Sequence, residues 1–515
     1  MRKILSPFAD VSPLPGEVPA ARARIAGAGR WTDAARAVRE ASGRLVALWG
    51  TDHRGQDGAF SVFAAYALAE GLCVAELAMH ADAPAYPDLS GLFPAANRMQ
   101  RAVRDLLGIE ALDARDRRPW LRHGAWREDE SPLRQDFARH EPGAPETYPF
   151  VRVEGDGVHE IPVGPIHAGI IEPGHFRFSV VGEKVLRLEQ RLGYTHKGID
   201  RRFGDFSIAE GYRLAGRVSG DSTVAYAWAY AQAAEAAAGI EPPARARWLR
   251  ALLLERERIA NHLGDLGALG NDGGFAFALS QFMRLKEDWL RANDEAFGHR
   301  FAMDAIVPGG VAMDPGPARL AAMARHAHEI ELEVLQLRRI FDEHSGLQDR
   351  FITAGRVTPE LAARLGLVGL GGRASGQAFD LRVDHPVDPY RDLKVKKVVY
   401  VAGDVAARVH ARFDELFESV RLVQAIVAGI SEGEVRIALP APAAGAFGVG
   451  WIEGWRGEVL VALEAGRDGR IARCHAHDPS WHNWPVLEHA VIGNIVPDFP
   501  LINKSFNMSY SGADT

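Results

Sequence analysis

Long segments with the helical spacing of apolar residues fill the middle of the chain, and they constrain its fold more than any other feature. In the run from Trp248 to Leu263, apolar residues recur at i, i+3, i+4 and i+7, which is the pattern of a helix that buries one face. Similar runs predict helices at 207–214, 222–238, 245–268, 278–296, 316–344 and 404–428. We therefore expect the centre of the chain to be a group of packed helices.

Short apolar runs bounded by turn residues flank this helical region and predict strands. Before it, strands are expected at 45–49, 59–63 and 72–77, a hairpin that turns at Gly182, and helices at 31–41 and 95–107. After it, strands are expected at 434–438, 447–453, 457–465 and 470–476.

These elements predict an α+β protein of two domains. A small α/β domain is expected over 1–145 and a mainly helical domain over 146–515. Residues 1–30 carry several prolines and are expected to be a partly ordered lead-in, and the polar stretch 138–150 a linker.

Composition excludes several classes of protein. The 515 residues carry a net charge of −7 and no large basic block, so no nucleic-acid partner is expected. No stretch reaches the length of a membrane-spanning helix, and the first residues lack the apolar run of a signal peptide. The only cysteines are Cys73 and Cys474, which fits a reducing cytoplasm and cannot hold a four-cysteine iron–sulfur cluster.

The first domain carries motifs of a known family. The run from Leu92 to Ile109, then Arg118-Pro-Trp120, then Pro132-Leu-Arg-Gln-Asp136 resembles the 30-kDa subunit of respiratory complex I. The resemblance covers roughly 80–137, and it implies a domain that scaffolds neighbouring subunits and holds no cofactor.

The rest of the chain carries a second series of motifs, spread over 160–514. They stand in the order Gly164-Pro-Ile-His167, Glu172-Pro-Gly-His-Phe-Arg177, Tyr194 to Asp200, Leu253 to His262, Gly372-Arg-Ala-Ser-Gly376, Asp384-His-Pro386, Gly403 to Arg408 and Asn483-Trp-Pro485. This series resembles the 49-kDa subunit of complex I and the large subunit of nickel–iron hydrogenases. The fusion of the two domains is similar to the large subunit of group 4, energy-converting hydrogenases of the formate hydrogenlyase type.

The resemblance places four metal-binding cysteines where this chain has none. The family motifs R-x-C-G-x-C and D-P-C-x-x-C fall on Arg217–Ser222 and on the C-terminal stretch, and their cysteine positions hold Ser219, Ser222, Ser509 and Gly512. Nickel and iron need soft, deprotonated thiolates, whereas a serine hydroxyl is a hard, protonated donor. We therefore expect no metal in this chain, and we expect the three serines to bind substrate.

Three residues are expected to be catalytic. Asp200 stands where the family has a glutamate and would relay protons, although a helix N-terminal acid is an equal alternative. His167 would donate to a quinone or another carbonyl oxygen, or make structural hydrogen bonds. Arg217 would supply a positive field in the cavity, or form a surface ion pair.

Two further residues are expected to bind substrate. His175 would donate to the same carbonyl compound as His167, and Arg373 would favour an anionic or electron-rich ligand. The family's quinone-binding tyrosine falls near Gly220, so it is missing here, and Tyr212 and Tyr226 are possible substitutes.

Two other patterns have some features of a cofactor site but do not predict one. The run Arg473 to Asp478, with His482, has the composition of a metal site, but the stretch Asp478 to Pro485 resembles a structural segment of the family. The run Gly369 to Gly372 lacks the strand, helix and acid of a dinucleotide site.

The resemblance implies the large subunit of a membrane-bound, complex-I-like redox complex that acts on a quinone or a similar acceptor. Expected partners are a small subunit that carries a 4Fe-4S cluster and complex-I-like membrane subunits, with this chain peripheral on the cytoplasmic side of the inner membrane. Two alternatives remain open: a hydrogen-evolving hydrogenase subunit and a non-catalytic coupling subunit.

Overall fold

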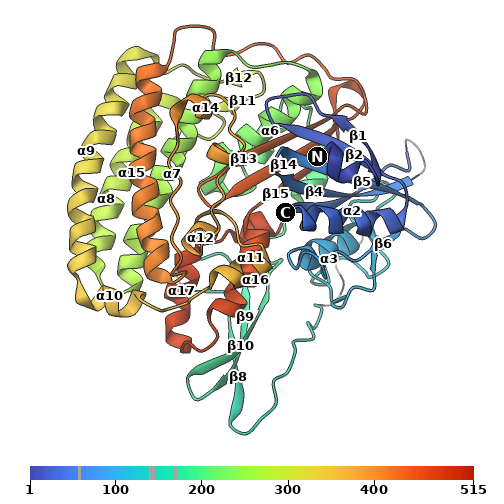
Figure 1. The fold of residues 1–515 in the computed structure, drawn as a ribbon, viewed down its shortest axis with the longest axis horizontal. Helices are drawn as coiled ribbons and strands as arrows, with labels where there is room; N and C mark the ends of the chain where they lie inside the picture. The colour runs from blue at the N-terminus through green and yellow to red at the C-terminus, as the bar shows by residue number, and fades with distance from the viewer. Residues whose placement is uncertain (56–58, 139–140, 142, 144, 168–170) are drawn as a thin grey trace.

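The protein is described by a computed structural model covering residues 1–515 except 56–58, 139–140, 142, 144 and 168–170. It mixes helix and sheet in both halves (Figure 1). A small sheet with three helices forms the N-terminal part. A second sheet lies beside it, and a bundle of long helices stands on the far side of that second sheet.

The small domain is built on a five-stranded sheet of order β1-β2-β5-β4-β3, in which only β2 and β5 run parallel. A short ribbon of β6 and β7 lies beside it. Its strands are β1 (Ala9–Pro13), β2 (Ala20–Ile25), β3 (Arg44–Asp52), β4 (Ala59–Leu68), β5 (Gly71–His80), β6 (Ala85–Pro87) and β7 (Glu110–Leu112). Its helices are α1 (Arg2–Leu5), α2 (Ala28–Glu40) and α3 (Ala96–Leu107).

The small sheet is covered on both faces. Helix α3 packs on β3 and ends at Gly108, whose φ of 65° is the left-handed conformation that favours glycine. The opposite face meets the second sheet through a continuous apolar layer. In that layer Trp49 and Phe63 stack, and Phe63 also stacks on Phe447. Burial on both faces fixes the small domain against the large one.

The large domain contains two three-stranded antiparallel sheets and a two-stranded ribbon. Its strands are β8 (Val158–Val163), β9 (His175–Val181), β10 (Lys184–Arg191), β11 (Ile306–Val307), β12 (Gly310–Val311), β13 (Phe447–Glu453), β14 (Glu458–Ala465) and β15 (Ile471–His477). The sheet β8-β9-β10 projects from the body of the protein, whereas β13-β14-β15 lies between the small sheet and helix α6 (Figure 1).

Helices make up most of the remainder. The long ones are α6 (Thr223–Ala238), α7 (Ala244–Asp272), α8 (Ala276–Phe297), α9 (Gly316–Glu343) and α15 (Val405–Gly429). The short ones are α4 (Ile199–Arg202), α5 (Tyr212–Ala215), α10 (Ser345–Phe351), α11 (Pro359–Leu365), α12 (Gly369–Ala374), α13 (Leu381–Asp384), α14 (Tyr390–Leu393), α16 (Ser480–Ala490), α17 (Phe499–Phe506) and α18 (Tyr510–Ala513). Helix α6 is buried along nearly its whole length, because its alanines let β13 and β14 pack closely against it.

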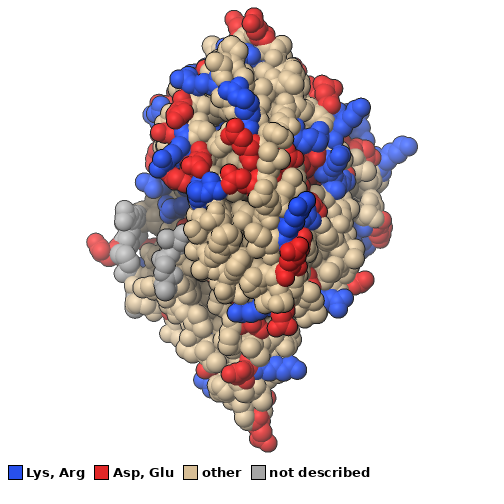
Figure 2. All heavy atoms as spheres, turned by 90° about the vertical axis from the view of Figure 1, so that its left-hand side faces the viewer, with Lys and Arg blue, Asp and Glu red and all other residues tan. Residues whose placement is uncertain are grey.

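The outer face of the helix bundle carries mixed charges. Figure 2 shows basic and acidic side chains interspersed over this side of the protein. Several form ion pairs, such as Arg284 with Glu333 and Arg300 with Glu287. Within the described ranges, no helix is both long enough and apolar enough to cross a membrane.

Most sequence-based expectations for the elements are confirmed. The long helices, the strands of the small sheet and β13, β14 and β15 lie where the patterns predict them. Three expectations are wrong. Residues 1–30 form α1, β1 and β2 rather than a loose lead-in, and 434–438 makes only an isolated bridge at Arg436. Of the helix expected at 207–214, only the last residues are helical, in α5, and most of the rest form turns. Helices and sheets both build the second domain, so the expectation that it is mainly helical is not confirmed.

The domain boundary at 145 and 146 stays a prediction. The expected linker, 138–150, lies partly outside the described residues. Its described part includes Tyr148, which contacts Arg101 of the small domain at 2.8 Å.

Candidate functional site

The two stretches expected to form one site meet in space. Ser219 precedes the turn that starts α6, and Ser509 caps α18 by accepting a hydrogen bond from Gly512 N at 2.9 Å. The Ser219 and Ser509 hydroxyl oxygens are 2.9 Å apart, although 290 residues separate them in sequence. The structure therefore brings together three of the four positions at hydrogen-bonding distance.

An ion pair closes this cluster of hydroxyls. Arg456, in the turn between β13 and β14, contacts the Asp221 carboxylate at 2.7 and 2.5 Å and the Ser222 hydroxyl at 3.1 Å. Ser219 donates to the same carboxylate at 2.9 Å. Burial opposes ionisation of Asp221, but Arg456 and Ser219 outweigh it and lower its pKa to about 2. Asp221 is therefore a permanent anion at neutral pH, matched by a permanent cation.

A carboxylate occupies the space beside the fourth position. A side-chain carbon at Gly512 would lie 2.5 Å from Asp478 Oδ2. Asp478 is held there because it accepts hydrogen bonds from the Tyr226 hydroxyl at 2.7 Å and from Ser480 N at 2.8 Å. Position 512 therefore requires a glycine, since any larger residue would displace the buried carboxylate of Asp478.

The arrangement does not fit the nickel–iron centre that the resemblance implies. Its donors are hydroxyls already engaged with each other or with Asp221 and Arg456. Such hard donors do not replace thiolates for these metals. The described ranges also contain no group of three or more His, Cys, Asp or Glu side chains placed to hold a metal ion. The two cysteines are buried in β5 and β15, outside this cluster.

A titratable residue that sequence reasoning missed lies next to this cluster. Glu257, on α7, accepts hydrogen bonds from Val224 N at 2.7 Å and Ala225 N at 3.2 Å, at the start of α6. Burial, with a contribution from Asp221, raises its pKa to about 8. Glu257 is thus the group at this site that can exchange a proton near neutral pH. Glu257 belongs to the family motif that runs from Leu253 to His262. This motif is the only sequence feature that indicates a role for it.

Asp200 lies at the junction of the two domains rather than among the serines. It receives hydrogen bonds from Arg473 Nη2 at 2.8 Å and His475 Nδ1 at 3.1 Å. Burial disfavours its charge, but Arg473 and His475 hold the pKa well below its usual range. Asp200 Oδ1 and His475 Nε2 face a void of about 30 Å³ that has room for a water. The proposed proton relay stays a prediction.

His167 and His175 both hold the loop that joins β8 and β9. His167 Nε2 lies 2.8 Å from the Gly174 carbonyl, and His175 Nδ1 lies 3.2 Å from the Gly164 carbonyl. Because a carbonyl only accepts, each of these nitrogens carries a proton. Burial lowers the pKa of His175, so its Nε2 is an acceptor, and it receives a hydrogen bond from Arg177 Nε at 3.4 Å. Residues 168–170 of the loop lie outside the described residues.

His175 borders an open cavity of about 630 Å³. Aromatic, basic and acidic side chains surround it: His123, Glu146, Tyr148, Phe150, Arg152, Glu160, Arg177, Arg191 and Tyr194. Arg177 forms an ion pair with Glu160 at 2.8 Å. The two tyrosines suggested by sequence lie elsewhere. Tyr226 is fully buried against Asp478, and the Tyr212 hydroxyl receives a hydrogen bond from Arg213 at 3.3 Å. The sequence analysis gave Tyr194 no role, because in the motif from Tyr194 to Asp200 only Asp200 was considered.

The two arginines expected in the cavity also have other partners. Arg217 is exposed and forms a two-bond ion pair with Asp304 at 2.7 and 2.8 Å. Arg373 is fully buried between Glu415 and Glu453. Neither makes a hydrogen bond to the three serines in the described structure. Their proposed roles toward a ligand stay predictions.

The packing at Gly512 generates the first prediction. Gly512→Ala should lower the free energy of unfolding by about 1–3 kcal/mol, because the new carbon overlaps Asp478. Gly220→Ala is the matched control, since no atom lies within 4 Å of the added carbon there. Chemical denaturation measures both. Equal stability of the two variants would show that Asp478 does not fill this space.

Glu257 generates the second prediction, on pH. Its pKa is raised from 4.5 to about 8 in the folded protein, so its contribution to stability is fully present below pH 4.5 and lost as the pH rises toward 8. Glu257→Gln removes this dependence. The melting temperature of the variant, relative to the unsubstituted protein, should therefore rise between about pH 5 and pH 8.

A surface variant controls the pH experiment. Glu432→Gln removes one carboxyl from an exposed position. If both variants show the same trend with pH, the buried carboxyl of Glu257 is ionised throughout the range and the assignment is wrong.

Comparison with known proteins places this geometry in a family. The profile described as respiratory-chain NADH dehydrogenase, 30 Kd subunit, matches residues 26–142, and that of the 49 Kd subunit matches residues 272–446. Formate hydrogenlyase subunit 5 of Escherichia coli (strain K12) is 30% identical over 488 residues, covering 92% of this chain and 85% of that protein. Hydrogenase-4 component G of the same organism is 31% identical over 488 residues, covering 92% and 84%.

A solved structure shares the fold. A chain of the membrane-bound sulfane sulfur reductase, an archaeal respiratory membrane complex, superposes with a TM-score of 0.66 at 22% identity, covering 70% of this chain and 99% of that chain. The order of the two domains is the one expected from the sequence motifs. The chain belongs to the family of complex-I-related large subunits that includes formate hydrogenlyase subunit 5 and hydrogenase-4 component G.

Proposed function

We propose that this chain is the large subunit of a membrane-bound, complex-I-like redox complex that works without a nickel–iron centre and passes electrons to a quinone or a similar carbonyl acceptor. Family membership supports the first part. One observation carries the second part: the four ligand positions hold three engaged hydroxyls and a glycine, closed by Arg456, Asp221 and Asp478. This observation argues against the hydrogen-evolving alternative.

The acceptor site that we propose is the cavity at His175. Its volume of about 630 Å³ lies within the usual range for small-molecule sites. Tyr194 is 40% exposed and stacks edge-on against His123, with ring centroids 4.5 Å apart. The Tyr194 hydroxyl and the guanidiniums of Arg177 and Arg191 are donors suited to carbonyl oxygens. A flat ring can also pack on Phe150 and Tyr148, which line the same space.

The chemistry in this cavity would be the reduction of a quinone to a quinol. Two electrons and two protons are taken up, and each carbonyl oxygen becomes a hydroxyl. The electrons would come from a 4Fe-4S cluster in a partner small subunit, because the two cysteines here are too few to hold one. The Tyr194 hydroxyl would donate to one carbonyl oxygen, and the product hydroxyl would replace Arg177 Nε, which lies 3.4 Å away, as the donor to Nε2 of neutral His175.

The family resemblance and the small number of cysteines also indicate which partners this chain would bind. The chain would bind an iron–sulfur small subunit and complex-I-like membrane subunits, and it would be peripheral on the cytoplasmic side of the inner membrane. The loop between β8 and β9 supports such a docking face because Ile166 is 87% exposed and Ile171 is 43% exposed. Two large apolar side chains on one loop are typical of a protein contact.

A buried charge network favours the coupling-subunit alternative. Its carboxylates outnumber its guanidiniums, so ionisation of every member would leave a buried negative charge. Burial and the neighbouring Asp380 raise the pKa of Glu453, despite the opposing effect of Arg373. A network that retains a proton could couple its release to movement of the helices. Its members are Glu255, Arg258, Arg373, Asp380, Arg382, Glu415 and Glu453.

Substitution of Tyr194 provides the third prediction. In the assembled complex, Tyr194→Phe should lower quinone reduction by about tenfold or more, because the donor to the acceptor oxygen is lost. The yield of complex should be unchanged, since Tyr194 is partly exposed and its hydroxyl lies at the edge of an open cavity. Acceptor turnover and complex yield are measured together.

Tyr212→Phe is the matched control for this experiment. Its hydroxyl contacts Arg213 outside the cavity, so turnover should be kept. If Tyr194→Phe assembles and keeps full activity, the acceptor does not bind at His175. If no assembled complex reduces a quinone, the coupling-subunit role replaces the redox role.

A further inference from the structure

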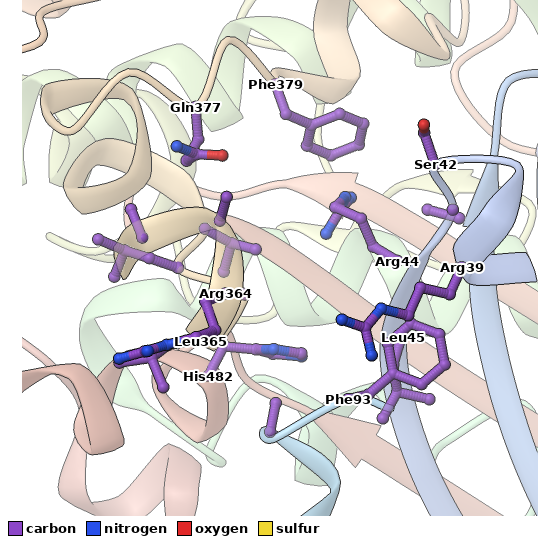
Figure 3. Close-up of a pocket in the computed structure, with 18 of the residues that line it drawn as sticks. Arg39, Ser42, Arg44, Leu45, Phe93, Arg364, Leu365, Gln377, Phe379 and His482 are labelled. Atoms are coloured by element: carbon purple, nitrogen blue, oxygen red, sulfur yellow. The ribbon is translucent and has the colours of Figure 1, made fainter. Parts of the chain in front are cut away.

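A second large cavity, of about 630 Å³, lies at the junction of the two domains (Figure 3). The small domain contributes Arg39, Arg44 and Phe93, and the large domain contributes Arg364, Phe379 and His482. None of the residues that line it belongs to the cavity at His175. It therefore has no part in the acceptor site proposed above.

The cavity carries unneutralised positive charge. Arg44 is committed to Glu458 at 2.6 and 3.1 Å and lies 3.8 Å over the Phe379 ring. Arg39 and Arg364 have no carboxylate within ion-pair distance in the described part of the chain. The acidic lining residue Asp384 is paired with Lys397 at 2.5 Å. Two guanidiniums are thus left to face an incoming anion.

Figure 3 shows how these groups are arranged. The Arg39 and Arg44 side chains extend from the small domain toward the side of the cavity that carries His482 and Gln377, with Phe379 above and Phe93 below. Leu45 and Leu365 add apolar surface on opposite sides of the cavity. A ligand in this space would touch basic groups and apolar surfaces together, and it would touch both domains.

A buried acceptor without a partner also faces this cavity. His482 is 1% exposed, and its Nε2 lies 2.8 Å from the Val46 carbonyl. Because the carbonyl accepts, Nε2 carries the proton and Nδ1 has a free lone pair. Nδ1 has no hydrogen-bond partner among the described residues. A buried polar atom left without a partner is costly, so a donor from a ligand would satisfy it.

We propose that the cavity between the domains binds a small anionic amphiphile, a molecule that joins a phosphate or carboxylate to an apolar or aromatic body and carries a hydrogen-bond donor. Arg39 on one side of the cavity, or Arg364 on the other, holds the oxyanion, the apolar side chains pack on the body, and His482 Nδ1 accepts from the donor. A protonated carboxyl, a hydroxyl or an amino group meets the last requirement. Because the ligand contacts both domains, its binding fixes their relative position and stabilises the chain.

Thermal unfolding of the full-length chain tests the proposal with matched probes. ADP and decanoic acid represent the phosphate and carboxylate sources. Inorganic phosphate and adenosine are the controls that lack the body or the charge. At saturation, ADP or decanoic acid should raise the melting temperature by at least about 2 °C, whereas the controls should not. No shift with either amphiphile, or an equal shift with phosphate or adenosine, would overturn the proposal.

Variants locate the binding within the cavity. The double variant Arg39→Ala and Arg364→Ala should weaken binding of the active probe at least about tenfold by calorimetry, because the oxyanion contact is lost on either side of the cavity. His482→Gln keeps a donor to the Val46 carbonyl but removes the Nδ1 acceptor, so binding should weaken while the fold is kept. Arg36→Ala is the control, since Arg36 is on the same helix and pairs with Asp33. Equal affinity in all variants would show that the probe binds elsewhere.

Discussion

The ion pair between Arg456 and Asp221 joins three distant parts of the chain. Arg456 comes from the turn between β13 and β14, Asp221 from the turn before α6, and Arg456 Nε also donates to the Asn507 carbonyl at 2.6 Å in the C-terminal stretch. The Arg456 side chain is only 7% exposed, so loss of Asp221 would leave a nearly buried guanidinium without its counter-ion. The pair therefore holds together the two stretches that in the related hydrogenase motifs would share a metal.

The polar groups of this cluster are therefore hydrogen-bonded to other groups of the same chain. Ser219, Ser222 and Ser509 each have hydrogen-bond partners, and Asp478 fills the space beside Gly512. Polar groups that can still make hydrogen bonds to a ligand lie elsewhere. They are found in the open cavity at His175 and at the junction of the domains, where His482 Nδ1 lacks a partner. Ligand chemistry is therefore expected at the edges of the large domain rather than at its former metal position.

Much of the fold could be predicted from the sequence because its signals are local. The periodicity of α7 and α9 and the apolar runs of β3, β4 and β14 needed no partner to be recognised. Strands β1 and β2 were missed because β2 is held by non-local pairing with β5, and β1 is an edge strand that pairs with β2. The approach of Ser219 to Ser509 was predicted from motifs.

The surroundings of the site could not be predicted in the same way. Nothing near Arg456 in sequence indicates that it pairs with Asp221, and Asp200 meets Arg473 only through the fold. The sequence also does not show which neighbours an arginine side chain will contact. Arg217 points to Asp304, and Arg373 enters a buried network. Glu257 was overlooked because burial, which raises its pKa, is a property of the packed structure.

The central claim is that this large subunit has exchanged a metal site for an ion-paired polar cluster. Elemental analysis of the assembled complex, purified with its partner subunits, tests it most directly. The account predicts nickel far below one atom per chain, with iron present only in the amount that the partner's cluster requires. One nickel per chain would contradict it.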